Sequence, residues 1–222
     1  MKNSFYNLWI LLLLLTATTG ILQAQTENWA NHIEAFDDSG GKGDTEDNPI
    51  KINTAGQLAM LAQKVNGGDS YVGKFFVLMS DLNLGAHLWT SIGIRANEDP
   101  FQEMKPFSGV FDGNGHIINN LISVSDHFDN GLFSTISAEA TVKNLSVVNC
   151  FLKGRNGIGA IIASNYGTVI NCNASGSVNG LTHHAGILVG FNNPGGVISN
   201  CYSYGTVSGA GNNVGEIGRA HV

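Results

Sequence analysis

The feature that most constrains this chain is a repeat of 27 to 29 residues in its C-terminal part. Gly159–Val178 and Gly186–Val207 both begin with glycine and an apolar stretch, continue through a glycine-containing turn, and reach a short apolar run ending in Asn-Cys. Asn171 of the first copy corresponds to Asn200 of the second, 29 residues later. Repeats of this period are typical of solenoids, in which each unit must stack on its neighbours to bury its apolar face.

Two less regular copies lie upstream, in Phe107–Leu121 and Gly131–Val147. In these copies Asn120 and Asn144 hold the position that Asn171 holds later. All copies are rich in Gly, Asn, Ser and Val and lack apolar runs with helical period, which favours short strands joined by tight turns. We therefore predict an all-β fold, a parallel β-solenoid with one rung per repeat.

The repeat also resembles a known family. The segment Asn165–Cys172, which reads Asn-x-Gly-x-Val-x-Asn-Cys after a glycine and small apolar residues, is similar to the GLUG motif of bacterial surface proteins. Phe111–Leu121 and Trp89–Gly93 resemble segments that accompany this motif. The resemblance covers roughly residues 48–215 and implies a right-handed β-helix. GLUG repeats also occur in immunoglobulin-cleaving peptidases, whose catalytic domain lies elsewhere, so the resemblance implies no peptidase activity here.

A short helix is predicted ahead of the repeats, where it would cover the unpaired edge of the first rung. Thr54 and Gln57 form a capping-box pattern, and Asn66-Gly-Gly68 stops the helix. Strands are expected on both sides, at 50–52, 74–79 and 81–84. The helix presents one apolar stripe, made of Leu58, Leu61, Ala62 and Val65.

The first 24 residues, Met1–Ala24, have the pattern of a secretory signal peptide. Lys2 is followed by the apolar run Leu8–Leu15 and by Leu22-Gln-Ala24, an acceptable cleavage site. The run is shorter than the roughly 20 residues of a membrane span, so we expect cleavage and a secreted or cell-surface protein. No cysteine lies at the cleavage site itself, which argues against a lipoprotein.

The remaining boundaries follow from composition. Asp37–Pro49 is acidic, rich in glycine and without periodicity, and it lacks the ligand spacing of a calcium loop, so a solvated lead-in is expected. After Gly215 the pattern breaks, and Glu216–Val222 is interpreted as a non-native tail on a truncated chain. The predicted organisation is a signal peptide at 1–24, a lead-in at 25–49, a cap helix and first rungs at 50–106, the repeat solenoid at 107–215 and the tail at 216–222.

Charge excludes one class of partner. The chain of 222 residues has a net charge of −6, and only 13% of its residues are charged. No basic patch for nucleic acid is present in the sequence. The partner is therefore left open between glycans and proteins of a host or bacterial surface.

Two columns of residues are expected from the repeat. The asparagine column would stack its amides about 4.8 Å apart, either as a structural ladder that pairs turn amides or as a polar ligand track on the surface. In the column beside it leucine and cysteine replace one another, as is expected of positions buried in a core. Cys150 lies outside it, and stacked cysteines point in parallel, a poor geometry for a disulfide, so unbridged buried thiols are expected. The columns are Asn120, Asn144, Asn171 and Asn200, and Leu121, Leu145, Cys172 and Cys201.

Other candidate groups carry weaker signals. The pair His183-His184 invites a metal interpretation, but adjacent residues of an extended segment point in opposite directions. Asp112 could act as an acid, although we expect no partner for it in later rungs. The insertion Arg95–Pro106 carries three acidic residues, Glu98, Asp99 and Glu103.

The sequence contains no peptidase, hydrolase or phosphate-loop signature. We therefore predict no catalytic, cofactor-binding or metal-binding set and a non-enzymatic surface module, an adhesin-like scaffold or spacer of a larger protein. The alternative is a carbohydrate-active β-helix of the lyase or glycosidase kind, which would need clustered carboxylates, or a carboxylate with basic residues, on one wall. A wall of Ser, Thr and Asn would favour the first function.

Overall fold

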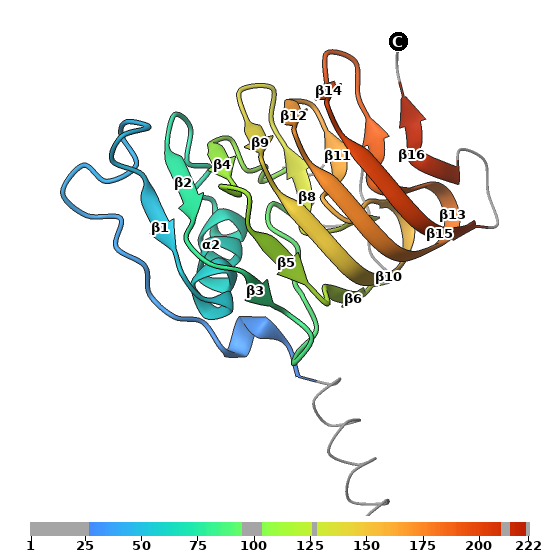
Figure 1. Cartoon of the computed structure of the whole chain (residues 1–222), viewed down its shortest axis with the longest axis horizontal. Helices are drawn as coiled ribbons and strands as arrows, with labels where there is room; N and C mark the ends of the chain where they lie inside the picture. The colour runs from blue at the N-terminus through green and yellow to red at the C-terminus, as the bar shows by residue number, and fades with distance from the viewer. Residues whose placement is uncertain (1–26, 95–103, 126–127, 210–213, 221–222) are drawn as a thin grey trace, which may run out of the picture.

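The computed structural model describes residues 27–94, 104–125, 128–209 and 214–220, and it confirms the predicted fold. Parallel strands of successive repeats stack side by side along the long axis of the molecule (Figure 1). The one α-helix in the described ranges lies at the N-terminal end of the stack. Every rung contacts the rung before and after it, which is the arrangement that the repeat predicts.

The first sheet contains one short strand from each of six rungs, and all its pairs are parallel. Three-residue strands suffice because tight turns flank each of them and the next rung supplies the hydrogen-bond partners. In their order across the sheet the strands are β1 (Ile50–Ile52), β2 (Phe75–Leu78), β4 (Val110–Asp112), β9 (Thr141–Lys143), β12 (Thr168–Ile170) and β14 (Val197–Ser199).

The second sheet is built on two long strands, β10 (Ser146–Ile158) and β13 (Asn173–Asn192), which pair in parallel with register shifts. β13 changes direction at Gly176 and His184, whose φ angles are 144° and 58°. The other members are β3 (Leu82–Asn83), β5 (Ile117–Asn119), β6 (Ile122–Val124), β7 (Phe128–Asn130), β8 (Phe133–Ile136), β11 (Ile162–Asn165), β15 (Tyr202–Gly209) and β16 (Val214–Ala220).

The core is a set of apolar columns that run through the stack. In the first sheet the residues that pair across neighbouring strands form an inward-facing column, so equivalent residues of successive rungs lie one above the other. The members from β1 to β12 are at most 1% exposed, whereas the member in β14, the last strand of this sheet in the described ranges, is only partly buried. This column consists of Ile50, Phe76, Phe111, Val142, Val169 and Ile198.

The helix α2 (Ala55–Gly67) closes the N-terminal end of this core, as predicted. Thr54 is its N-cap and accepts a hydrogen bond from the Gln57 backbone N–H at 3.1 Å. The Gln57 side chain reaches back to the N–H of Asn53 at 2.7 Å, one residue earlier than in the usual capping box. The expected apolar stripe is buried, and Gly68 ends the helix at φ 120°. In the described ranges, no helix has both the length and the apolarity to cross a bilayer.

The lead-in is exposed in the part expected to be solvated and packed in the part before it. Asp37–Pro49 is exposed or half-buried apart from Gly43. The short 3-10 helix η1 (Trp29–Asn31) packs beside α2, and Phe36 is buried in the core against Phe76. Further along, the N–H of Phe75 donates to the carbonyl of Gly43 at 2.9 Å. Scattered aromatic residues rather than periodicity hold this segment, which is why composition alone suggested a linker.

The strand register corrects the alignment of the first repeat. Asn119 pairs with Val148, so Asn120 lies level with Asn149 and not with Asn144. Ile122 pairs with Phe151, so Leu121 lies level with Cys150. The physical reason is that Asn120 and Asn149 form a second left-handed corner, at φ angles of 56° and 53°, which lies five residues beyond the corner at Asn144.

The chain end follows the same path as the earlier rungs. The backbone of β16 pairs in parallel with β13, with Val214 opposite Ala185 and Ile217 opposite Val189. The sequence there lacks the apolar pattern of the repeat, yet its backbone completes part of another rung. That Glu216–Val222 is non-native stays a prediction.

Two phenylalanines test this architecture. Phe111 is 0% exposed in the core column, whereas Phe151 on β10 is 48% exposed. We expect Phe111→Ala to lower the free energy of unfolding by about 3–5 kcal/mol, because it leaves a cavity. Phe151→Ala should lower it by less than about 1 kcal/mol. Urea unfolding followed by circular dichroism measures both; equal losses would show that the inward face of β4 is misassigned.

Candidate functional site

The turn that joins the two sheets is built on asparagine in the left-handed conformation. Asn144, Asn171 and Asn200 have φ angles of 54°, 53° and 52°. Asparagine adopts this conformation more readily than other residues with a Cβ atom. The turn amides are paired by the backbone of the next rung: Asn144 N–H donates to Ile170 O and Asn171 N–H to Ser199 O, both at 3.1 Å.

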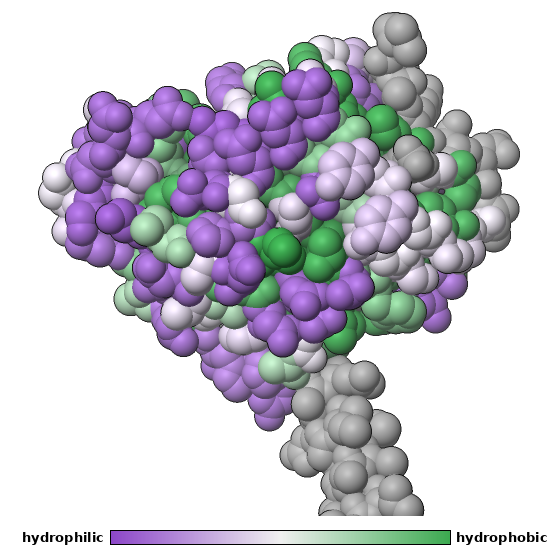
Figure 2. Space-filling model, in the orientation of Figure 1, coloured by the Kyte–Doolittle hydropathy of each residue, from purple (hydrophilic) through white to green (hydrophobic). Residues whose placement is uncertain are grey.

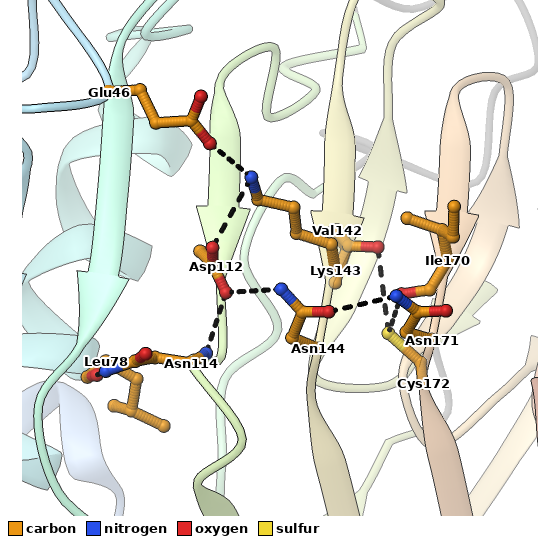
Figure 3. A network of polar contacts seen from close by, with 10 residues as sticks. All are labelled: Glu46, Leu78, Asp112, Asn114, Val142, Lys143, Asn144, Ile170, Asn171 and Cys172. Carbon is orange, nitrogen blue, oxygen red and sulfur yellow. Dashed lines mark hydrogen bonds and ion pairs between the residues drawn. The ribbon is translucent and has the colours of Figure 1, made fainter.

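The asparagine side chains form a ladder of their own on the outside of this turn, shown in Figure 3. Asn171 Nδ2 donates to Asn144 Oδ1 at 3.2 Å, and Asn144 Nδ2 donates to Asp112 Oδ1 at 3.0 Å. The predicted ladder is therefore present here, but it links side chains to one another and does not pair turn amides. Asn120 belongs to a second ladder, where its Nδ2 donates to Asn83 Oδ1 at 3.1 Å.

Asp112 ends the first ladder, and it has charged neighbours that the sequence analysis did not expect. The register places Lys143 opposite Asp112 in the next rung, and Lys143 Nζ lies 3.4 Å from Asp112 Oδ2. Lys143 Nζ also donates to Glu46 at 2.5 Å, from the lead-in (Figure 3). The expectation that Asp112 lacks a partner in later rungs is wrong, because the repeat alignment paired the wrong residues.

The chemistry of this cluster is that of an ion pair. The hydrogen bond to Glu46 is the largest effect on Lys143; with the charges of Asp112 and Glu46 it raises the pKa of the lysine and keeps it protonated. Asp112 also accepts from the backbone N–H of Asn114 at 2.7 Å. The hollow beside the cluster has a volume of about 50 Å³, far below the roughly 300 Å³ at which small-molecule pockets begin. The cluster ties the lead-in to β9 and, through Lys143, to β4, and it leaves no room for a sugar ring.

The outward face of β10, β13 and β15 is the broadest candidate surface. Register aligns its residues in rows across the strands: Ser146 with Asn173 and Tyr202, and Phe151 with Ser177 and Thr206. Tyr202 and Tyr204 are 62% and 65% exposed. We call this face the polar wall; it consists of Ser146, Phe151, Lys153, Asn173, Ser177, Asn179, Tyr202, Tyr204, Thr206 and Ser208.

No member of the polar wall is acidic. Figure 2 shows the same side of the molecule, with hydrophilic residues gathered over the N-terminal rungs and pale or hydrophobic ones toward the C-terminal strands. Hydroxyl and amide groups can donate and accept hydrogen bonds, and exposed tyrosines add flat contact area. The wall is thus suited to binding through contact, and within it no carboxylate is available for acid–base catalysis.

A smaller cleft of about 310 Å³ lies beside Trp89. Its polar side chains already bind one another: Ser123 Oγ donates to Asn130 Oδ1 at 2.6 Å and Ser91 Oγ to Gly131 O at 2.7 Å. The Ser91 bond connects two rungs and the Ser123 bond closes a corner within one rung, so the groups serve the scaffold. The acidic insertion Arg95–Pro106 was a separate candidate, but Glu98, Asp99 and Glu103 lie outside the described residues.

The three cysteines are unbridged, as expected. Cys150 and Cys172 are buried and Cys201 is half-buried. Cys172 lies level with Cys201 of the next rung, and its backbone N–H donates to Cys201 Sγ at 3.4 Å. The close contact of the two thiols raises the pKa of Cys172 and lowers that of Cys201. Burial raises the pKa of Cys150 to about 11. Cys201 is therefore the most reactive of the three.

The histidine pair does not form a shared metal site. The rings of His183 and His184 are 6.0 Å apart, and His184 Nδ1 lies 3.0 Å from Asn156 Oδ1. Among the residues that the structure describes, the group of three potential metal ligands lies at the other end of the molecule and consists of Glu27, His32 and His87. The sequence analysis missed this group because the spacing of its three residues matches no known metal-binding motif.

The comparisons with known proteins agree with the fold. No protein-family model matches the chain. Halomucin from Haloquadratum walsbyi is 32% identical over 147 residues, which are 65% of this chain and 2% of halomucin. A structure from Bacteroides ovatus named as an immunoglobulin A1 protease is 23% identical with a TM-score of 0.55, covering 74% of this chain and 50% of that one. The chain spans only a small part of halomucin, and the structural likeness shows the fold alone.

The asparagine turn yields a stability prediction. Asn171→Leu should lower the free energy of unfolding by about 1–3 kcal/mol, because a leucine at φ 53° is strained and one hydrogen bond is lost. Asn171→Gly loses the same bond without strain and should cost less. Thermal melts of both variants provide the measurement, and an unchanged midpoint for Asn171→Leu would contradict the left-handed turn.

The cysteine column yields a reactivity prediction. At about pH 8, near the ordinary pKa of a thiol, iodoacetamide should modify Cys201 first, since Cys150 and Cys172 are buried with raised pKa values. Cys201→Ser should abolish this early modification, as read by peptide mass spectrometry. Cys172→Val should be tolerated, and dithiothreitol should leave the melting temperature unchanged. A disulfide-linked peptide containing Cys172 and Cys201 would refute the unbridged state.

Proposed function

We propose that this protein is an exported, non-enzymatic module of a larger surface protein, a solenoid scaffold that adheres through its polar wall. The single observation behind the proposal is the composition of that wall. Its Tyr, Ser, Thr and Asn side chains resemble those that dominate antibody binding loops, where rigid aromatic contacts combine with adaptable hydrogen bonds. Such a surface suits a neutral polar partner, a glycan or a glycosylated protein.

The location rests on two features. Met1–Ala24 has the pattern of a signal peptide, and the chain is similar over 147 residues to a protein named halomucin. Both support an extracellular place. The fold supports the spacer role, because a solenoid extends by adding rungs and holds its outward residues at fixed spacing.

The non-enzymatic part of the proposal rests on where the acidic groups lie. Glu46 and Asp112 are engaged with Lys143 at a turn, and Asp81 is bound to His116 at 3.0 Å. Glycoside hydrolysis needs paired carboxylates on the face that holds the sugar, and the polar wall has none. The protease name of the Bacteroides ovatus structure belongs to that protein, and the similarity of this chain to it extends only to the fold.

The test is binding to an array of bacterial and host glycans, followed by affinity measurements on the strongest hit. We expect Tyr202→Ser and Tyr204→Ser each to weaken binding about tenfold, the loss expected when a central aromatic contact is truncated. Val197→Ser on β14 is the matched control, since Val197 is 49% exposed on the same rung but in the other sheet. Equal losses in all three variants would reject the polar wall as the binding face.

The glycans that bind in this test also serve to test whether the protein is an enzyme. Incubation of the protein with the bound polysaccharide should release no reducing ends and no unsaturated products. Products whose formation scales with protein concentration would replace the proposal with the carbohydrate-active alternative.

A further inference from the structure

We propose that Glu27, His32 and His87 bind a divalent transition-metal ion of the zinc type. The three residues come from two segments that are far apart in sequence. Glu27 and His32 flank η1, and His87 lies in the turn after β3. The backbone brings them together: Trp29 N–H donates to Leu88 O at 2.9 Å, and Leu88 N–H donates to Glu27 O at 2.8 Å.

The donor atoms of the group are already close to one another. His32 Nε2 lies 2.9 Å from Glu27 Oε2, and His87 Nδ1 lies 4.0 Å from the same oxygen. All three donor atoms fall within 4.8 Å of one another. Zinc binds imidazole nitrogen and carboxylate oxygen at about 2.0–2.2 Å, so two donors on one ion can be at most about 4 Å apart. A small inward movement brings the group to this spacing.

One donor atom of the group is unpaired. His87 Nδ1 is buried and has no hydrogen-bond partner among the residues that the structure describes. A buried polar atom left unpaired is unfavourable, and a bound metal ion would pair it. Two neutral imidazoles and one carboxylate form a donor set that suits zinc, with a further position left for water or another ligand.

The aromatic surroundings hold the two histidines in place. Their rings stack 3.9 Å apart at an interplanar angle of 8°, and Trp29 contacts both edge to face, at 6.1 Å from His32 and 5.0 Å from His87. Ring lone pairs lie in the ring planes, so parallel rings must tilt to point at one ion. Metal binding therefore exchanges the stack for coordination and changes the environment of Trp29.

The proposed site ties the start of the described chain to the turn after β3. Glu27 and His32 lie beside the N-terminal cap, and Trp29 Nε1 donates to Leu84 O at 3.0 Å across the same junction. A metal ion there would fasten the capping segment to the first rungs. It would also protect the open end of the solenoid from fraying.

The test uses purified protein treated with a chelator, freed of it, and titrated with zinc sulfate. Isothermal titration calorimetry should give one zinc ion per chain, with a raised melting temperature and a change in tryptophan fluorescence. Binding should weaken in acid, because protons compete with the metal ion for the imidazole nitrogens. The absence of both heat and melting shift in the unaltered protein would overturn the proposal.

Substitutions distinguish this site from incidental binding. Glu27→Gln and His32→Gln should each weaken zinc binding by at least about tenfold, while both replace partly exposed side chains and preserve the fold. His116→Ala is the matched control, because His116 also contacts a carboxylate, Asp81, but belongs to no group of three ligands in the described residues. Cys201→Ser excludes the half-buried thiol as the ligand. Zinc binding that survives both glutamine variants, or that is lost in either control, would place the ion elsewhere and refute the proposal.

Discussion

The whole structure depends on the in-register hydrogen bonding of one rung to the next. In a parallel stack each strand finds its partners on two neighbours, so a rung is stable only if the adjacent rung has the same shape. The turn between the sheets is the place where this demand is strictest. Asn144, Asn171 and Asn200 all turn at φ angles within two degrees of one another, and the amides of Asn144 and Asn171 donate to the rung that follows. The repeated asparagine is therefore a consequence of stacking, and its side-chain ladder is secondary to its backbone conformation.

The same constraint explains how much of the fold was predictable from the sequence. The solenoid, the strand at 50–52, the cap helix and the cysteine column from Leu145 onward follow from period and pattern, and the structure contains them. The first repeat was misaligned, because Asn120 lies at a second left-handed corner, level with Asn149, and not at the corner of Asn144. Spacing along the sequence does not separate the two corners, since asparagine occupies both. The strand register decides whether Lys143 lies opposite Asp112. It is set by hydrogen bonds between rungs, so it could not be predicted from the spacing of residues in the sequence.

The candidate sites were less predictable than the fold, for a related reason. Glu46 reaches Lys143 across 97 residues, and His87 meets His32 across the cap. These contacts involve the lead-in and the turn after β3, which lie outside the repeat and have no period. What holds the lead-in is a few aromatic residues, such as Phe36 and Trp29, whose packing depends on the shape of the first rungs. A composition rich in Asp and Gly predicted a solvated segment because it averages over these few side chains.

The polar wall shows where function can reside in such a molecule. Inward residues must be apolar and must fit the residues of the adjacent rungs, since the core is close-packed. Outward residues carry no such demand, so the wall can vary while the fold stays the same. Rows such as Ser146, Asn173 and Tyr202 are created by register across three rungs, and no motif along the chain contains them. No acidic residue lies on the wall, and its one charged member is Lys153. Its chemistry is therefore set by residues that lie side by side on neighbouring strands and not by a motif along the chain.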